Sequence, residues 1–379
     1  MTIIPARMFL PSFNPLFGSA LAGGIALVAV ASAASAQGQS CAADFNDDGS
    51  VGGSDLGAIL AGWGPCDAGS SCNVDITGDG SVDGADLGAL LAVWGPCITV
   101  PTWATLIEEQ PDPAVVHDAS LRAAIAATGY AWRVKDTATQ MEMVLIPPGS
   151  FQMGCSPSAI YPCDGDESPV HSVTLPNAFY MGRYEVTQAQ WTARMGSNPS
   201  FFQSASSAVP ASQVPNRPVD RVSWSAIQGF LGSTGMRLPT EAEWEYAYRA
   251  GTTTAFHSMP GSPSGTNDDF GSLPGTIAWY SVGSASQTRP VGQKAGNGFG
   301  LHDMSGNVRE WVNDWYSATS YASSPSVNPQ GPGSGSTRVL RGGSWGTNTF
   351  HLRSSRRDAS GPSGGGSDYG FRVVRAPGS

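Results

Sequence analysis

The chain has 379 residues, 40% of them hydrophobic, and this length accommodates two or three domains with a sizeable core. Gly (48) and Pro (28) make up a fifth of the chain, which predicts many loops and few long helices. The formal net charge is -10, and nine Asp with no Lys, Arg or Glu fall between Gly38 and Val100. This acidic block favours cation binding and argues against a nucleic-acid partner.

The first 36 residues have the pattern of a signal peptide. Arg7 is their only charged residue, Leu16 to Val30 is apolar, and Ala34-Ser35-Ala36 forms a small-residue cleavage site. An uncleaved N-terminal membrane anchor is the alternative. No later segment is long and apolar enough to span a membrane. We therefore expect an exported protein that is secreted, periplasmic or held at the cell surface.

Residues 41–66 and 72–97 repeat each other with a period of 31. The first copy reads CAADFNDDGSVGGSDLGAILAGWGPC and the second reads CNVDITGDGSVDGADLGALLAVWGPC. Each copy contains a twelve-residue loop of the EF-hand type, with Gly49 or Gly80 at the sixth position, where such a loop turns sharply. The repeat therefore predicts two calcium loops in one module, 41–97.

Calcium is a hard cation that takes six to eight oxygen ligands, and alternating acidic side chains on a tight turn supply them. Helices are expected after the loops, over Asp55–Trp63 and Asp86–Trp94, because apolar residues recur there at helical spacing. Val51 and Val82, at loop position 8, are expected to pair the two loops in a short β contact. The expected ligands at loop positions 1, 3, 5, 7 (by its carbonyl) and 12 are Asp44, Asn46, Asp48, Ser50 and Asp55, and Asp75, Thr77, Asp79, Ser81 and Asp86.

The twelfth position of each loop holds Asp rather than Glu, and one helix follows each loop, a pattern that resembles dockerin modules. The resemblance implies a cohesin-like partner, because dockerins carry proteins onto cohesin domains. Dockerins usually present hydroxyl residues at loop positions 10 and 11, where this chain has Gly53-Ser54 and Gly84-Ala85. A calcium-rigidified spacer or a cell-wall attachment module therefore stays open.

Six cysteines in an exported chain favour disulfides over free thiols. In the module, one possible pairing is Cys41–Cys66 with Cys72–Cys97, which closes each repeat on itself. Another is Cys41–Cys97 with Cys66–Cys72, which joins the two ends of the module to each other. We favour this second pairing, the clasp, because a two-fold arrangement places the end of each helix near the start of the other loop. The disulfide candidates are Cys41, Cys66, Cys72 and Cys97 in the module, and Cys155 with Cys163, which are expected to pair with each other.

Residues 98–140 are expected to form a linker with the first elements of the next domain, including a short helix over Ala119–Ala127. That domain is expected over 141–376, with short strands, two or three short helices and long loops. The expected helix caps are Thr187 with Gln190, Ser223, and Thr240 with Glu243.

An ordered set of segments runs from Met143 to Arg375 and includes MVLIPPGSFQMG, RLPTEAEWEYA, GLHDMSGNVREW, RGGSW and YGFRVVR. Together they resemble the sulfatase-modifying factor, or formylglycine-generating enzyme, family. The resemblance implies a compact α+β fold with little regular secondary structure, related to the C-type lectin superfamily. The paired calcium loops add a small helical module to this fold.

The family's oxidases convert a sulfatase cysteine to formylglycine with copper and oxygen, and copper(I) is a soft ion that demands thiolate ligands. Ser344 matches the family's active-site serine. In the family's oxidases, two cysteines follow this serine by three and eight residues. These positions hold Thr347 and Leu352, and Arg309 replaces an aromatic residue of the family motif. We therefore expect calcium but no copper, and a non-catalytic domain. A formylglycine-generating oxidase, or another enzyme with a rearranged site, is the alternative.

The resemblance also implies a structural calcium ion, for which Asp303 and Glu310 supply carboxylates and Gly306 and Val308 supply carbonyls. A second family calcium site needs an Asn where this chain has Ile277, so we expect that site to be absent.

The leading hypothesis is thus a binding or assembly domain, with a peptide or glycan groove by analogy with lectin-related folds. Arginines in the later part of this domain are expected to be buried structurally rather than to form an anion-binding face; they are Arg341, Arg353, Arg356 and Arg357.

Overall fold

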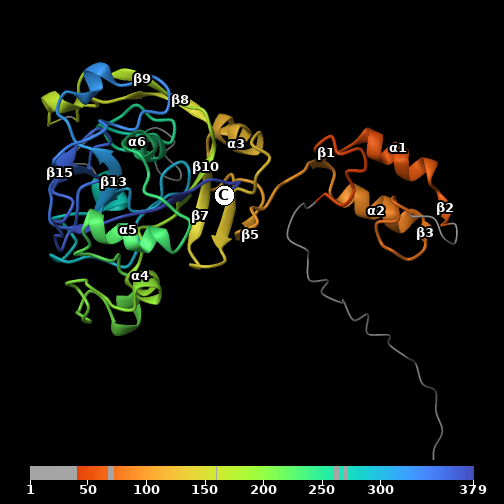
Figure 1. Cartoon of the computed structure of the whole chain (residues 1–379), viewed down its shortest axis with the longest axis horizontal. Helices are drawn as coiled ribbons and strands as arrows, with labels where there is room; N and C mark the ends of the chain where they lie inside the picture. Colours follow the sequence, from red (N-terminus) through yellow and green to blue (C-terminus); the bar gives the residue numbers. More distant parts are fainter. Residues whose placement is uncertain (1–40, 67–71, 159, 259–264, 268–271) are drawn as a thin grey trace, which may run out of the picture. The chain divides into compact units, whose positions relative to one another are not determined.

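The computed structural model describes residues 41–379 except 67–71, 159, 259–264 and 268–271. The expected signal peptide, residues 1–36, lies outside the described residues. In the part of the chain that is described, no helix has the length and apolar character needed to cross a membrane. The module (41–97) and the domain that follows it are described separately below (Figure 1).

Two helices form the module, α1 (Gly53–Ala61) and α2 (Gly84–Ala92), each beginning two residues before its expected start. Ile59 and Leu90 are fully buried at equivalent positions of the two helices, and they pack in one small core with the loop residues Val51 and Val82. The sequence repeat thus folds as two equivalent halves around a shared apolar centre.

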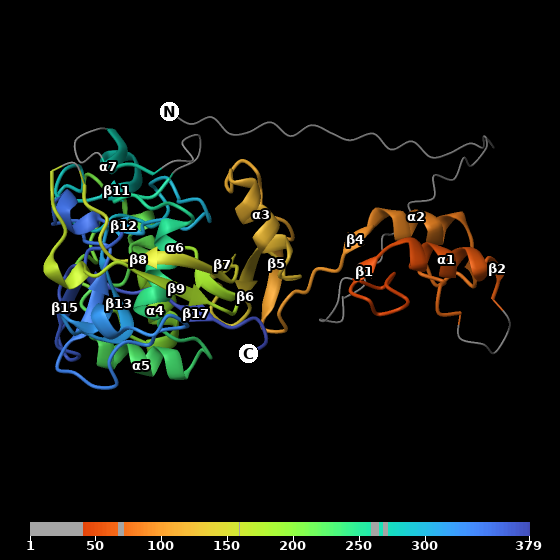
Figure 2. The same cartoon turned by 90° about the horizontal axis from the view of Figure 1, so that it is seen from above.

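Four two-residue strands connect the halves crosswise. β1 (Ser50–Val51) pairs with β4 (Gly95–Pro96), and β2 (Gly64–Pro65) pairs with β3 (Ser81–Val82). Figure 2 shows β1 beside β4 at one end of the helices, with β2 at the other end. The expected strand contact between Val51 and Val82 is therefore wrong, because each loop pairs with the residues that follow the helix of the other half.

The crosswise pairing also brings the cysteines together. Cys41 is bonded to Cys97, and Cys66 is bonded to Cys72. This is the clasp rather than a closed loop for each repeat. It follows from the same two-fold arrangement, since the residues after α2 return to the start of the first loop.

The following domain contains a five-stranded antiparallel sheet in the order β17-β10-β7-β6-β5. Its strands are β5 (Ala104–Glu108), β6 (Arg133–Asp136), β7 (Glu142–Ile146), β10 (Phe179–Gly182) and β17 (Val374–Arg375).

Much of the segment expected as a linker, 98–140, therefore belongs to the domain. Strands β5 and β6 lie in the main sheet, and α3 (Ala119–Ala126) lies between them in sequence. Fully buried apolar residues such as Val116, Ile125 and Trp132 tie this segment to the core. Ile125 lies in the helix that the sequence predicted, whereas the short strand β6 gave too brief an alternation to be predicted.

A second, four-stranded sheet has the order β15-β14-β13-β16. Its strands are β13 (Arg309–Trp315), β14 (Arg338–Arg341), β15 (Asp358–Ser360) and β16 (Tyr369–Gly370). Two strand pairs complete the sheets: β8 (Gly149–Met153) with β9 (His171–Leu175), and β11 (Ala278–Trp279) with β12 (Ser305–Gly306).

The helices begin at the predicted caps. Thr187 and Thr240 each accept a hydrogen bond from the third helical N–H and form capping boxes, and Ser223 caps α5. All nine residues of α6 are buried, and Figure 1 shows this helix enclosed by strands and loops. The helices are α4 (Gln188–Met195), α5 (Trp224–Gly232), α6 (Glu241–Arg249) and α7 (Ser272–Ile277), and the short 3-10 helices are η1 (Gly165–Glu167), η2 (Ala211–Asn216), η3 (Ser320–Ser323) and η4 (Thr349–Leu352).

Candidate functional site

Ser344 lies on the turn that follows β14 and is fully buried. Gly342 and Gly343 precede it with φ of +88° and +69°, a left-handed conformation that glycine adopts without strain. The Thr347 hydroxyl accepts a hydrogen bond from the Ser344 N–H (2.9 Å) and donates one to the Ser344 carbonyl (3.0 Å). Thr347 thus closes the turn on itself.

Leu352, the second position at which the family carries a cysteine, lies in η4 and is fully buried. It belongs to a small apolar cluster with Phe256 and Ile277, which are also fully buried, and with Ala255 and Ala278. The two positions therefore hold a hydroxyl that is used within its own turn and an aliphatic side chain in an apolar core. Neither fits copper(I), which requires soft sulfur ligands.

Arg309 supplies a charged group near Ser344. Its guanidinium pairs with Asp368 at 2.5 Å and with Asp358 at 3.1 Å, and the Ser344 hydroxyl donates to Asp368 at 3.2 Å. Burial alone raises the pKa of Asp358, but the hydrogen bond from His351 and the charges of Arg356 and Arg309 outweigh it and lower that pKa to about 2. Ser344 and Arg309 thus both contact the Asp368 carboxylate.

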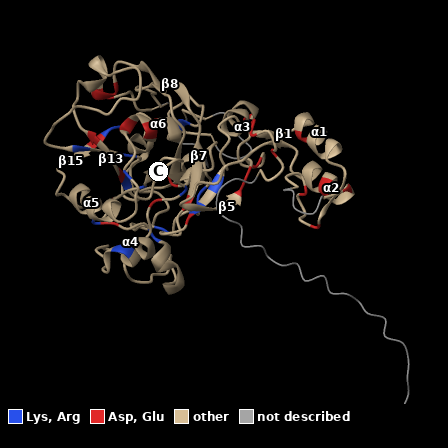
Figure 3. Cartoon of the chain, turned by 45° about the vertical axis from the view of Figure 1, so that its right-hand side comes forward, with Lys and Arg blue, Asp and Glu red and all other residues tan. Residues whose placement is uncertain are grey.

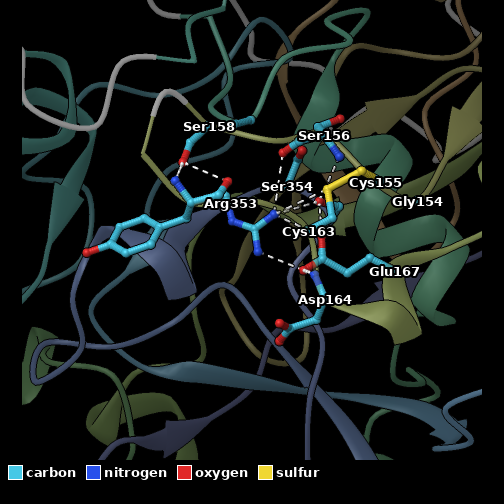
Figure 4. The surroundings of a disulfide bond; sticks show 12 residues. Gly154, Cys155, Ser156, Ser158, Cys163, Asp164, Glu167, Arg353 and Ser354 are labelled. Atoms are coloured by element: carbon cyan, nitrogen blue, oxygen red, sulfur yellow. Dashed lines mark hydrogen bonds and ion pairs between the residues drawn. A yellow bond between two sulfur atoms is a disulfide. The ribbon is translucent and has the colours of Figure 1, made fainter.

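The remaining cysteines also form a disulfide, between Cys155 and Cys163. Figure 4 shows this bond beside Arg353, whose guanidinium points at Glu167. Arg353 donates to both carboxylate oxygens of Glu167, at 2.9 and 2.7 Å, and both side chains are fully buried. No cysteine of the described residues carries a free thiol, so none replaces the two missing copper ligands.

The segment from Asp303 to Glu310 winds tightly, with positive φ at Asp303 (57°), Gly306 (84°) and Asn307 (58°). The Asp303 carboxylate accepts one hydrogen bond, from the Gly292 N–H at 2.6 Å, while its buried Oδ1 atom has no partner. Burial raises the pKa of Asp303 to about 6. An unpartnered buried carboxylate oxygen is the group that a calcium ion would engage.

Glu310 is used differently. Both of its carboxylate oxygens accept hydrogen bonds of 2.6 Å from Arg372, and Oε2 also accepts one of 2.7 Å from the indole N–H of Trp244. Among the expected ligands of this site, Asp303 fits a cation best, and Glu310 already has its counter-charge in Arg372.

Glu185 is a residue of this region that the sequence analysis missed. It lies just before the cap of α4, is 1% exposed, and accepts hydrogen bonds from the Val308 N–H (3.0 Å) and the Asn307 side chain (2.6 Å). Burial raises its pKa well above the ordinary value, and the charges of Asp303 and Glu310 raise it further. The only sequence signal was a single acidic residue next to a helix cap.

The calcium loops of the module are shaped by their acidic side chains. Asp44 accepts hydrogen bonds from the Asp48 and Gly49 N–H groups at 3.1 and 2.9 Å, and Gly49 has φ of +85°. Asp55 accepts from the Phe45 and Gly52 N–H groups at 2.8 Å each, and the bond from Gly52 is the largest cause of its lowered pKa.

The second loop repeats this pattern. Asp75 accepts from Gly78 and Gly80, and Asp86 accepts from Thr77 and Asp83. In Figure 3, α1, α2 and their loops carry acidic positions but no basic ones. Within the described ranges, three carboxylates come within 4.8 Å of one another at Asp164, Asp166 and Glu167 rather than in either loop. Calcium in the loops therefore remains an expectation.

The four arginines form ion pairs instead of an anion-binding face. Arg341 pairs with Glu245 at 2.5 Å, and Arg357 binds both oxygens of Glu241 at 2.8 and 2.9 Å. Arg356 pairs with Asp164 and Asp358, and Arg353 pairs with Glu167 as described above. These charges hold η1, α6 and the segment 353–358 together.

The model of the sulfatase-modifying factor enzyme 1-like domain matches residues 129–377. The chain belongs to this family. The match begins before β6, which agrees with a domain that starts earlier than residue 141.

Relatives with different names share the family domain. A formylglycine-generating enzyme of Streptomyces coelicolor is 34% identical over 303 residues, which cover 66% of this chain and 94% of the relative. A chaperone protein, LppX, of Paenibacillus barcinonensis is 30% identical over 312 residues, or 68% of this chain and 97% of the relative.

Solved structures support the fold. Treponema denticola variable protein 1 is 30% identical with a TM-score of 0.53, and the likeness covers 62% of this chain and 95% of that one. PvdO from Pseudomonas aeruginosa is 29% identical with a TM-score of 0.52, over 64% of this chain and 97% of that one. The expected formylglycine-generating-enzyme-like mixture of helix and strand is thereby supported for the domain.

Proposed function

We propose that this chain is an exported, calcium-binding protein whose family domain binds or assembles with a partner and does not oxidise cysteine. The observation that carries the proposal is the pair Thr347 and Leu352 at the positions of the family's copper-binding cysteines. The Thr347 hydroxyl bonds to the backbone of its own turn, and the Leu352 side chain lies in an apolar cluster. Arg309 and its two carboxylate partners fill the space beside Ser344.

Export is inferred from the signal-peptide pattern of residues 1–36 and from the three disulfides, which persist in oxidising compartments. Calcium is inferred from the ligand pattern of the two loops and, in the family domain, from the unpartnered oxygen of Asp303. A cohesin-like or cell-wall partner remains our proposal for the module. One relative is named a chaperone protein, which supports a role other than formylglycine formation.

The decisive test is an oxidase assay. The purified protein, supplied with copper, is incubated with a peptide containing the C-x-P-x-R sequence, and mass spectrometry searches for the aldehyde. The Streptomyces coelicolor relative serves as the positive control. We expect no aldehyde above the level without enzyme, and turnover would overturn the proposal.

The double variant Thr347→Cys with Leu352→Cys sharpens this test. We expect it to bind copper(I), measured by metal analysis after dialysis, while each single variant and the parent protein do not. Equal copper binding by all four proteins would show that copper uses other ligands.

Calcium binding by the module is tested by chelation. Nine Asp without basic neighbours repel one another when metal is removed, so we expect EGTA to loosen residues 41–97 and calcium to restore them. The dissociation constant should be about 0.1–1 mM, as in other extracellular modules. Circular dichroism and melting that do not change with EGTA would contradict this expectation.

A further inference from the structure

A cavity of about 390 Å³ lies in the family domain and contains none of the residues discussed for copper or calcium. Five chain segments meet there: the turn between β9 and β10, the residues leading into α6 with its first turn, the middle of β13, the loop 328–330, and Ala376 after β17. Its volume falls within the range of small-molecule sites, about 300–1,000 Å³.

The floor of this cavity is apolar and its rim is polar. Leu175, Phe179 and Leu238 lie in the floor and are at least 97% buried, so only their edges face the cavity. The rim carries four carboxamide side chains, those of Asn177, Asn313, Asn328 and Gln330, all on exposed residues.

The rim has free hydrogen-bonding capacity. In the described part of the chain, the carboxamides of Asn177 and Asn313 make no hydrogen bond, whereas Gln330 donates to Asn328 at 3.3 Å. Arg237 and Glu243 add one ion pair, with contacts of 2.6 and 2.7 Å, and their charges cancel. The lining therefore offers both donors and acceptors without net charge.

The adjoining strand edge is already occupied. Thr174 of β9 pairs with Val327 in a parallel bridge, and its N–H and carbonyl bond to Ser326 and Asn328. An extended peptide that binds by adding a strand needs a free edge, and this segment removes it. The ligand must instead be recognised by side chains.

We propose that this cavity binds a neutral oligosaccharide, an inference that rests on the proposed role of the domain in binding. Sugar hydroxyls both donate and accept, as carboxamides do, and each Asn offers two donors and an acceptor. The C–H face of a sugar ring is apolar and matches the floor. A lining without net charge gives no electrostatic advantage to a charged ligand.

The test uses isothermal titration calorimetry of the full chain with maltotriose, cellotriose and chitotriose as probes, and with a capped, uncharged hexapeptide. We expect at least one trisaccharide to bind with a dissociation constant below about 1 mM. Asn177→Ala with Asn313→Ala should weaken that binding about tenfold or more, because two hydrogen bonds are lost. Gln228→Ala, an exposed carboxamide on α5 outside the cavity, should leave it unchanged.

Three results would overturn the inference: no trisaccharide binds, the double variant binds as tightly as the parent, or only the hexapeptide binds. Both substituted residues are exposed, and an unchanged melting temperature verifies that the double variant is folded. Failure here is distinct from failure of the proposed function, because aldehyde formation is measured with a different substrate and does not involve this cavity.

Discussion

Two carboxyls of the family domain, the half-buried Asp358 and the fully enclosed Asp303, differ in how their charges are compensated. Asp358, in the region of the missing cysteines, has its pKa lowered to about 2 because His351, Arg356 and Arg309 outweigh its burial. Asp303, in the calcium region, has its pKa raised to about 6 because burial dominates. Asp358 forms ion pairs with Arg309 and Arg356, whereas Asp303 forms no ion pair among the described residues and shares the charge of Arg372 with two other carboxyls.

The difference indicates that the region around Ser344 balances its charges internally, whereas the region around Asp303 holds more carboxyls than guanidinium groups. Around Ser344 the polar groups form hydrogen bonds and ion pairs with one another. Around Asp303, one guanidinium, that of Arg372, serves three buried carboxyls, those of Glu185, Asp303 and Glu310. That charge deficit is what a cation would correct.

The largest effect is expected from Arg372→Met. The substitution removes the guanidinium that binds both oxygens of Glu310 and leaves buried carboxyls uncompensated. Urea unfolding in EGTA should show a loss of about 3–5 kcal/mol in the free energy of unfolding. Arg237→Met, which breaks a pair whose arginine is 48% exposed, is the control and should cost less than about 1 kcal/mol. Equal losses would mean that burial does not set the strength of these pairs.

A smaller loss is expected from Leu352→Ala. Its side chain is fully buried against Phe256 and Ile277, so the substitution opens a cavity that should cost about 2–5 kcal/mol. Leu106→Ala, at a residue that is 43% exposed, is the matched control and should be nearly neutral. A loss below about 1 kcal/mol at Leu352, measured by urea unfolding, would show that this position is loosely packed and open to a ligand.

The pH dependence should differ in sign between the two carboxyls. For Asp303, whose pKa rises on folding, the metal-free protein should lose stability as pH rises from about 4 to about 6, by roughly 2–3 kcal/mol. Asp303→Asn should flatten this slope, and calcium should oppose it. For Asp358, whose pKa falls on folding, stability is present above about pH 4 and is lost as pH falls toward about 2.

These slopes are measured by urea unfolding at stepped pH in EGTA, with Asp358→Asn as the companion variant. If Asp303→Asn loses stability between pH 4 and 6 as the parent protein does, the titrating group is another residue. Glu185 is then the first candidate, because its pKa is also raised.

The smallest effect is expected from Thr347→Val, which keeps the shape of the side chain and removes its hydroxyl. Two hydrogen bonds to the backbone of Ser344 are lost, and the cost should be about 1–2 kcal/mol. Thr105→Val, which removes the one hydrogen bond of an exposed hydroxyl to the Lys135 carbonyl, provides the comparison. No measurable change in thermal unfolding for Thr347→Val would indicate that the turn does not depend on this residue.

Local signals in the sequence predicted much of this structure. The helix caps Thr187, Ser223 and Thr240 lie where the capping pattern placed them, because a cap depends on residues three positions apart. The period of 31 predicted the module and its clasp.

The contacts that the sequence did not predict join residues that are distant in the chain. Strand β5 pairs with β6 across about 30 residues, and Glu185 reaches Asn307 across 122 residues. Neither contact has a local periodicity. The crosswise pairing of β1 with β4 was missed for the same reason, although the two-fold symmetry that produces it had been used to choose the disulfides.

The Cys41–Cys97 disulfide gives the module an unusual mechanical position in the chain. The Cα atoms of these two residues lie 5.5 Å apart, although 56 residues separate them in sequence. Tension applied along the polypeptide, from a point before Cys41 to a point after Cys97, passes through the sulfur–sulfur bond and bypasses both loops. A load applied across the module would therefore leave the geometry of its two acidic loops undisturbed for as long as the bond remains oxidised.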